Sequence, residues 1–445
     1  MPHADVVVVG AGLAGLVAAA RIAESGAAVT LVAKGHASTH WGSGGLDVAG
    51  PAGAATPAEG VASLAAQDHP YGFLAPDVAP SVAWLLEHLE AGGLPYAGTL
   101  DTPIRRVPTA IGGTRRVAIV PAAQAAALRP WDPDEILVIA GPAGYKDFWP
   151  AAIADSLGRG AVWKGSDHPD RVVGVTVDLD GVADRNNLNA LHLARRFDDP
   201  AQRDGDIARF AAAVKKAAGG RPGRVAVPAI VGLERHAEAW AELRARLPLE
   251  PFEIPLVPPS IPGIRLWRVL RAIIRAAGGR VQVGEAVARI HVEDGRVTAV
   301  EMEAAARSQV IRTEALVLAT GGIAGGGLVA THDGHIVEPL LGLHVDAVGH
   351  EEWLVSDALD PAGHPIEAAG IRTDGDLRPL AGDGRPAPLV NVRVAGALLA
   401  GQRSIRERCG DGIAVASGWR AANGLTTDAK STPIEREPLA VRTDQ

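Results

Sequence analysis

The sequence predicts an α/β protein in which a Rossmann-like domain carries an inserted α/β capping domain. Three observations favour this fold class. A glycine-rich turn lies between a strand and a helix at the start of the chain, strand-like and helix-like runs alternate through the middle, and a buried strand near residue 315 returns to the first pattern. We therefore divide the chain into a first domain built from residues 1–116 and 285–425, and an inserted capping domain of residues 117–284.

The first strand, residues 5–9, is a run of β-branched residues without polar alternation, which indicates a buried parallel strand. The helix after it has apolar residues at helical spacing. Between the two, Gly10, Gly12 and Gly15 form the pattern G-x-G-x-x-G. The first glycine makes the tight turn, the second lets backbone approach a pyrophosphate, and the third lets helix and strand pack closely. The cofactor-binding residues expected here are Gly10, Ala11, Gly12, Leu13, Ala14 and Gly15.

A second strand, residues 28–33, is expected to end beside the ribose of a dinucleotide, at Ala33 and Lys34. Dinucleotide-binding units commonly end this strand with an acidic residue that accepts hydrogen bonds from ribose hydroxyls. The alanine and lysine in its place count against an ordinary NAD dehydrogenase.

The loop after this strand, residues 38–47, is unusually small and polar for its position. Close approach of backbone to the cofactor would explain its glycines. A mobile surface turn is the alternative, although Trp41 and Leu46 would be unusual on a mobile tip. The cofactor contacts expected from this loop are His40, Ser43, Gly44, Gly45 and Leu46.

The capping domain is predicted from alternating runs in the middle of the chain. Strand-like runs at 135–139, 172–177 and 224–231 alternate with helix-like runs at 207–218, 235–246 and 266–277.

The first domain resumes with a hairpin, in which runs at 287–290 and 297–300 flank Asp294 and Gly295. A further buried strand, residues 315–319, follows it. This strand runs into Ala-Thr-Gly-Gly, as recurs in two-part flavoproteins, where it passes close to the adenosine half of FAD. The cofactor contacts expected here are Thr320, Gly321 and Gly322.

The last strand, residues 389–395, precedes a helix that begins near Cys409 and runs to about Ala422. The N-terminus of this helix is expected to face the cofactor, where its dipole would favour negative charge on a reduced flavin. The contacts expected from this region are Gly396, Cys409, Gly410, Gly412 and Ile413. Residues 426–445 are polar and aperiodic, and we expect a disordered tail.

Composition narrows the class of protein. The 445 residues carry a net charge of −8, which argues against nucleic acid as a partner. The one cysteine excludes an intramolecular disulfide and leaves no thiolate set for zinc or an iron–sulfur cluster, so no metal site is predicted. No apolar run approaches the roughly 18 residues that a membrane span needs, and the start lacks a basic signal sequence. A cytoplasmic location is expected.

Several longer motifs resemble one family, the B subunit of anaerobic glycerol-3-phosphate dehydrogenase. They are Gly-Ala-Gly-Leu-Ala-Gly-Leu at 10–16, Thr-His-Trp-Gly-Ser-Gly-Gly-Leu-Asp at 39–47, Pro-Ala-Ile-Val-Gly-Leu at 228–233, Pro-Pro-Ser-Ile-Pro-Gly-Ile-Arg-Leu at 258–266, Gly-Gly-Gly-Leu-Val-Ala at 325–330 and Glu-Pro-Leu-Leu-Gly-Leu at 338–343. The resemblance implies a flavin-bearing subunit of the fumarate-reductase-like group, which tolerates a small residue at position 33. The chain departs from the family pattern at 402–405 and 408–412.

The resemblance also implies a function. The chain would pass electrons from oxidation of glycerol 3-phosphate to dihydroxyacetone phosphate toward a quinone. Its partners would be a catalytic flavoprotein subunit and an iron–sulfur membrane-anchoring subunit, which would hold it at the inner face of the cell membrane. The family is associated with FMN, but a G-x-G-x-x-G helix binds a pyrophosphate, so we expect FAD. The alternatives are a stand-alone FAD-dependent dehydrogenase of another small hydroxy compound, or a non-catalytic flavin relay.

Candidate catalytic residues are fewer. His69 and His236 are candidates for proton transfer, because histidine is the side chain whose ordinary pKa lies near neutral pH, with a structural role as the alternative. Arg265, in a glycine- and proline-bounded loop, would bind a carboxylate or phosphate of the small-molecule substrate, unless it makes a structural ion pair. Covalent attachment of the flavin to His40 is a further hypothesis, and we favour non-covalent FAD. Arg403, Arg406 and Arg408 are either a solvated charge run or an anion site.

Overall fold

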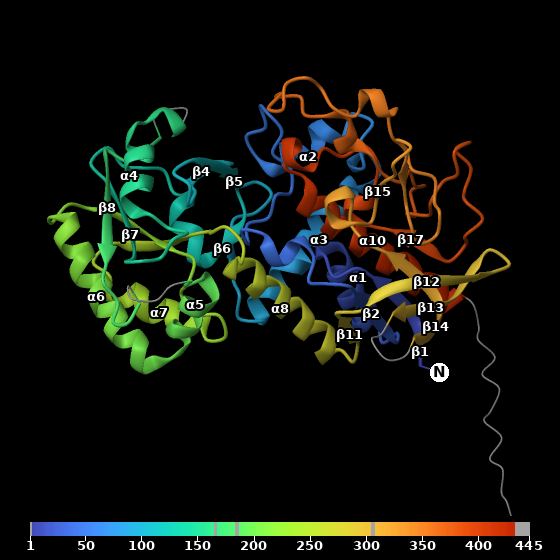
Figure 1. The fold of residues 1–445 in the computed structure, drawn as a ribbon, viewed down its shortest axis with the longest axis horizontal. Helices are drawn as coiled ribbons and strands as arrows, with labels where there is room; N and C mark the ends of the chain where they lie inside the picture. Colours follow the sequence, from blue (N-terminus) through green and yellow to red (C-terminus); the bar gives the residue numbers. More distant parts are fainter. Residues whose placement is uncertain (1, 164–166, 183–186, 304–307, 432–445) are drawn as a thin grey trace, which may run out of the picture.

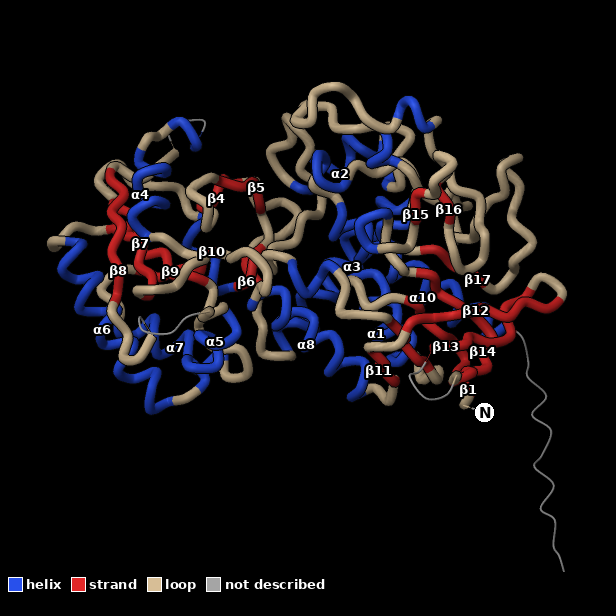
Figure 2. The backbone as a smooth tube through the Cα atoms, viewed as in Figure 1, coloured by secondary structure: helices blue, strands red, loops and turns tan. Residues whose placement is uncertain are grey.

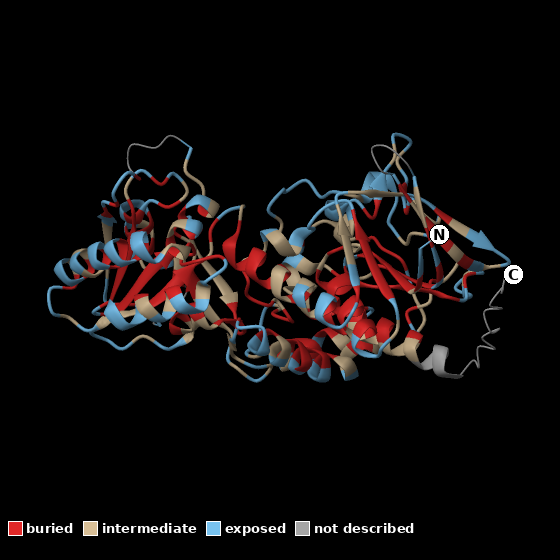
Figure 3. Cartoon of the chain, turned by 90° about the horizontal axis from the view of Figure 1, so that it is seen from below, coloured by how far each residue is buried: buried red, intermediate tan, exposed pale blue. Residues whose placement is uncertain are grey.

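The computed structural model describes residues 2–163, 167–182, 187–303 and 308–431. These residues form two lobes that lie side by side, each with its own sheet (Figure 1). Each lobe also has its own buried core, seen as separate centres of buried residues in Figure 3. The predicted α/β class, with a Rossmann-like domain and an inserted α/β domain, is confirmed.

The large lobe is built on a mixed sheet in which strands run in the order β11-β2-β1-β14-β13-β12, with β17 pairing β14. All of its pairs are parallel except β12 with β13 and β13 with β14. The bounds are β1 His3–Val9, β2 Val29–Ala33, β11 Arg280–Val283, β12 Ala286–Glu293, β13 Arg296–Glu303, β14 Gln309–Leu318 and β17 Val392–Val394. The predicted hairpin is present, and Asp294 and Gly295 both have positive φ, as its tight turn requires.

Helices α1 (Leu13–Glu24), α10 (Gly410–Ser431), α3 (Tyr71–Ala91) and α8 (Ile261–Ala276) pack together beside this sheet. A side chain on Gly418 would lie 2.4 Å from the Ala14 carbonyl oxygen, so α10 crosses α1 at backbone distance. Helix α10 continues to Ser431, past the predicted end at Ala422; the rest of the predicted tail, 432–445, lies outside the described residues.

Much of the chain between β14 and α10 is loop (Figure 2). The shorter elements of the large lobe are α2 Pro57–Ala65, β3 Tyr96–Ala97, β6 Val120–Pro121, β15 Val329–Ala330, β16 Ile336–Val337 and α9 Ser404–Glu407.

The small lobe is a parallel sheet of order β10-β9-β7-β8, covered by helices. Its strands are β7 Ile136–Pro142, β8 Arg171–Val177, β9 Gly223–Pro228 and β10 Glu250–Ile254, and its helices are α4 Pro150–Gly158, α5 Ala190–Asp198, α6 Pro200–Ala218 and α7 His236–Arg246. A hairpin of β4 (Arg105–Pro108) and β5 (Thr114–Val117) lies between this lobe and the large one (Figure 1).

The boundary between the lobes differs from the one expected at 284/285. Ile261 and Ile264, at the start of α8, pack in the small core, whereas Leu266 and Trp267 pack in the large core. Strand β11, also assigned to the capping domain by its sequence, pairs with β2 in the large sheet. An amphipathic pattern shows that a helix has an apolar face, but it does not show which of two cores that face contacts.

Candidate functional site

The three glycines of the turn at the carboxyl end of β1 differ in what surrounds them. A Cβ on Gly10, which has φ +117°, would lie 2.1 Å from the Ala319 carbonyl oxygen, and a Cβ on Gly15 would lie 2.0 Å from the Gly10 carbonyl oxygen. A Cβ on Gly12 would meet only Ala37, at 3.7 Å. Gly10 and Gly15 therefore let the chain pack on itself, whereas Gly12 borders open space.

This space lies at the start of α1, where the first N–H groups have no side-chain cap. Unpaired N–H groups and the helix dipole favour a phosphate at such a position. The open cradle above Gly12 thus fits the pyrophosphate of FAD, which FMN lacks. When bound, FAD would supply hydride and electron transfer.

The opposite wall is the end of β14. Thr320 has a buried hydroxyl without a hydrogen-bond partner among the described residues, and Gly321 has φ +87°. Gly322 approaches the Ala397 carbonyl oxygen, which a Cβ would meet at 2.9 Å. A Cβ on Gly396 would lie 2.8 Å from that of Ala14. The ends of β1, β14 and β17 thus meet at one edge of the sheet, and the Thr320 hydroxyl remains available to a ligand.

Strand β2 ends as expected at Ala33, which is buried, followed by Lys34, which is exposed. The Ala33 carbonyl accepts from the Gly284 N–H at 2.9 Å, so this strand end is tied to the turn after β11. A contact of either residue with the ribose stays a prediction.

The loop at residues 38–47 is held against both lobes. Gln124 donates to the Ser43 carbonyl at 2.9 Å, Tyr96 donates its hydroxyl to the Gly44 carbonyl at 2.6 Å, and the Leu46 N–H donates to a carbonyl at 2.9 Å. A Cβ on Gly44 would lie 2.7 Å from Pro262 at the start of α8. These contacts hold residues 43–46, whereas Trp41, nearer the start of the loop, is 64% exposed. Contact of this loop with the cofactor stays a prediction.

His40 belongs to an aromatic cluster beside the glycine turn. Its ring lies 4.6 Å from that of His36 and 5.9 Å from that of Trp267, and Trp267 donates its indole N–H to the Ala11 carbonyl at 3.2 Å. Burial, together with the charges of His36 and Arg268, lowers the pKa of His40 to about 4. The imidazole is therefore neutral at pH 7.

The start of α10 is covered by protein. The N–H groups of Asp411 and Gly412 both donate to the Asp47 carbonyl, at 3.1 and 3.2 Å. A Cβ on Gly412 would lie 2.2 Å from the Tyr71 hydroxyl, and Cys409 and Ile413 are fully buried. Contact of Cys409, Gly410, Gly412 and Ile413 with the cofactor stays a prediction, and it would need groups other than these two donors.

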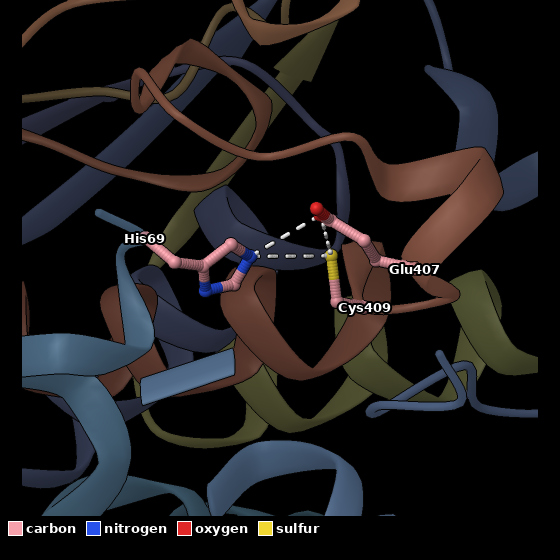
Figure 4. Close-up of side chains that lie close together, drawn as sticks. All are labelled: His69, Glu407 and Cys409. Atoms are coloured by element: carbon pink, nitrogen blue, oxygen red, sulfur yellow. Dashed lines mark hydrogen bonds and ion pairs between the residues drawn. The ribbon is translucent and has the colours of Figure 1, made fainter. Parts of the chain in front are cut away.

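His69 faces Glu407 and Cys409 (Figure 4). Its Nδ1 accepts from the Tyr71 N–H at 3.1 Å, which leaves the ring proton on Nε2, 3.3 Å from a Glu407 oxygen and 3.8 Å from Cys409 Sγ. Burial opposes ionisation of Glu407, but the hydrogen bond from His69 and the N–H of Arg403 outweigh it and lower the pKa. Burial and the Glu407 charge raise the pKa of Cys409.

These three side chains are close enough to surround an ion. A metal would need Nε2 and the thiol deprotonated, and a proton moved to Nδ1 would then point at the Tyr71 N–H. The hydrogen bonds therefore favour a proton-sharing cluster.

His236 and Arg265 lie together in a different place. Arg265 is buried and forms an ion pair with Glu253 at 2.7 Å, while also donating to the carbonyls of Val231 and Gly232. His236 Nδ1 lies 2.7 Å from the Val231 carbonyl oxygen, and burial and the Arg265 charge lower its pKa to about 4. This is the structural ion pair that the sequence left open.

A cluster that the sequence did not indicate lies where the 43–47 loop meets α10. Asp411 accepts from the Asp47 N–H at 2.9 Å, and Asp47 in turn binds Arg115 at 3.0 Å and Arg408 at 3.5 Å. Burial and the Asp47 charge raise the pKa of Asp411 to about 7. Arg115 also donates to Ser43. The arginines around residues 105–116 were the available signal, but their partners are remote in sequence.

Comparison with known proteins decides the family. The family model described as FAD binding domain matches residues 5–413. A Halobacterium salinarum protein, named as the probable B subunit of an anaerobic glycerol-3-phosphate dehydrogenase, is 32% identical over 94% of this chain and 97% of its own. The chain belongs to this FAD-binding family of B subunits. A Yersinia pestis relative, named as the B subunit of anaerobic glycerol-3-phosphate dehydrogenase, is 29% identical over 96% of this chain and 99% of its own.

The fold of an open flavocytochrome c3 fumarate reductase aligns over 96% of this chain and 79% of its own, at 12% identity and a TM-score of 0.44. The family assignment confirms FAD as the cofactor and an FAD-dependent oxidoreductase subunit as the class of protein; FMN has no support. Among the described residues, none of the helices combines the length and apolarity needed to cross a membrane.

Proposed function

We propose that this chain is the flavoprotein B subunit of a respiratory-type glycerol-3-phosphate dehydrogenase complex. It passes electrons from the oxidation of glycerol 3-phosphate to dihydroxyacetone phosphate toward a quinone. The observation that carries the proposal is the near full-length similarity to relatives named as this subunit, together with an open pyrophosphate cradle at Gly12.

Electrons leave through a partner. An iron–sulfur cluster is commonly held by four cysteine thiolates, whereas this chain has one cysteine, Cys409, which is buried and has a raised pKa. The relay centres therefore belong to an iron–sulfur subunit, which also anchors the complex to the inner face of the cell membrane. A second, catalytic flavoprotein subunit completes the complex.

Of the predicted catalytic residues, we keep His69 as a proton carrier. It is the one whose ring proton points at a carboxylate, Glu407, in a chain of hydrogen bonds that adjoins α10. We assign His236 and Arg265 to the stability of the small lobe, because their polar atoms bind its own carbonyls and Glu253. We keep the predicted contacts of the glycine turn, the 40–46 loop and residues 320–322 with FAD.

Anaerobic reduction tests the proposal. We expect glycerol 3-phosphate to bleach the flavin when the chain is joined by its partner subunits, and the three subunits to co-purify at native expression levels. The flavin-free variant Gly12→Val in the same complex controls for the flavin of the partner.

Two results would replace the proposal. Full turnover of a small hydroxy acid by the isolated chain, at roughly 1 to 1,000 per second with a soluble dye, would support a stand-alone dehydrogenase. Failure of this chain's flavin to bleach while glycerol 3-phosphate reduces the catalytic partner in the same complex would remove the chain from the electron path.

A further inference from the structure

Three arginines gather beside the loop that follows Asp47. Arg106 and Arg116 are directly opposite each other in the antiparallel β4–β5 hairpin. Arg116 donates to the carbonyls of Gly50, Pro51 and Ala54. A Cβ on Gly50 would lie 3.5 Å from the Cβ of Arg408, so the same loop lies between the hairpin and Arg408.

The Arg116 guanidinium is repelled by the charges of the other two arginines. Burial lowers the pKa of Arg116, and the charges of Arg106 and Arg408 lower it further. Like charges directly opposite in a sheet are destabilising. The chain therefore holds these side chains together at a cost.

Carboxylates do not balance this charge. Arg106 donates to the Thr114 hydroxyl at 3.1 Å and Arg116 to backbone carbonyls, and neither has a carboxylate partner among the described residues. Arg408 lies 3.5 Å from Asp47, but that carboxylate is already bound to Arg115 at 3.0 Å. All of these arginines are half-buried, so water screens the excess positive charge only in part.

Backbone strain points to the same place. Arg408 has φ +46° and ψ +51°, the left-handed conformation that costs an ordinary residue roughly 1–2 kcal/mol. It lies between α9 and α10, and this conformation directs the chain from one helix to the next. A non-glycine residue held in this way is a common feature of ligand sites.

The cluster adjoins the cofactor loop. Arg408 lies 3.5 Å from Asp47, the last residue of that loop, and Arg116 donates to the carbonyl of Gly50, three residues further on. A ligand held by these arginines would therefore lie beside the end of the loop expected to contact the flavin.

We propose that Arg106, Arg116 and Arg408 bind the phosphate of a small phosphorylated substrate. A phosphate dianion would offset two of these three positive charges, and a guanidinium group can bind two of its oxygens at once. This inference rests on the proposed function, since it names the chemical class that the same flavin site accepts.

Binding of inorganic phosphate and of glycerol 3-phosphate to the FAD-loaded chain tests the inference by calorimetry. Arg106→Gln is expected to weaken both at least tenfold, because Arg106 has no carboxylate to release, and Arg106→Lys is expected to recover part of the loss. Arg105→Gln is the matched control: Arg105 is its neighbour on β4 but pairs with Asp167 at 2.8 Å. The control should bind like the original chain, FAD content should be equal in all four proteins, and the Tm of Arg106→Gln should not fall below that of the original chain, because the substitution removes a like charge opposite Arg116.

Absence of phosphate binding in the original chain, or equal binding by Arg106→Gln, would overturn the inference. So would preference for a dicarboxylate such as succinate over glycerol 3-phosphate. If phosphate binding depends on Arg106 but glycerol 3-phosphate never reduces the flavin, even in the complex, then the proposed function fails while the phosphate site stands.

Discussion

Arginines of the small lobe and arginines beside the cofactor loop are both shielded from water, but their partners differ. Arg203, Arg224 and Arg265 are almost completely buried, and each binds a glutamate at 2.5 to 2.7 Å. Arg106 and Arg116 are half-buried and have hydroxyl or carbonyl partners instead. A buried charge must be paired, so the glutamates of the first group keep buried charges from being left alone. The second group lacks carboxylate partners, and it is there that we propose an anion site.

The carboxyl ends of the two sheets differ in the same way. In the large lobe, β1 and β14 lead into turns that contain glycines, Gly10 after β1 and Gly321 after β14, with open space above Gly12. In the small lobe, the segment after β9 is closed by Glu253, which accepts from the Val231 N–H at 3.1 Å while paired with Arg265. Ligands of open α/β sheets bind at the carboxyl ends of strands, but only where the protein leaves its own donors free.

The largest effect is expected from a substitution at the open carboxyl end of β1. In Gly12→Val the side chain would extend into space bordered only by Ala37, so the chain should fold but bind no FAD. Acid precipitation and absorbance of the released flavin measure this; a yellow pellet would instead indicate covalent attachment. Loss of a ligand present at 100 times its Kd would also remove about 2.7 kcal/mol of stability.

Gly205→Val is the matched control, because Gly205 lies exposed on α6 with nothing within 4 Å of its Cβ position. It should retain full flavin. Retention of flavin by Gly12→Val as well would mean that the turn does not contact the pyrophosphate.

The next largest effect is expected from a substitution at the closed carboxyl end of the small-lobe sheet. Glu253→Gln leaves the buried Arg265 charge without its counterion, and we expect a loss of about 3 kcal/mol or more in the free energy of unfolding. Asp180→Asn, which removes the exposed partner of Arg209, should cost less than about 1 kcal/mol. Urea denaturation followed by tryptophan fluorescence compares them. Equal losses would show that burial does not separate the two kinds of pair.

The smallest effect concerns Asp411, which joins the cofactor loop to α10. The pKa of its carboxyl is raised to about 7, whereas the value for an aspartate in the unfolded chain is near 4. Between pH 4 and pH 7 the folded protein therefore carries a proton on Asp411 that the unfolded chain has lost. The stabilisation is complete below pH 4 and is lost as pH rises through 7.

Asp411→Asn removes this dependence and keeps an oxygen to accept from the Asp47 N–H. Relative to the variant, the original protein should lose roughly 3 kcal/mol between pH 4.5 and pH 8, most of the roughly 4 kcal/mol that a shift of about three pKa units is worth. Thermal unfolding of both FAD-loaded proteins across this range measures the difference. Parallel curves would exclude proton uptake by Asp411 in the folded protein.

Part of the fold of both lobes was predictable from the sequence. The glycine turn, the strands on either side of α1, the hairpin at Asp294 and helices α6 and α7 of the small lobe were predicted from the sequence, because each depends on φ/ψ preference or on apolar spacing within a few residues. Helices α4 and α5 were not predicted. The resemblance predicted the family and FAD.

By itself, the sequence determined the local elements, the family and the cofactor class of this protein. Only the tertiary structure decided that α8 belongs to both cores, that Arg265 is paired, and that Asp411 meets Asp47, 364 residues away along the chain. The physical reason is how far apart in the sequence the interacting residues lie. Backbone geometry and periodicity are written in neighbouring residues, whereas the state of a charge depends on which distant carboxylate or carbonyl the fold places beside it.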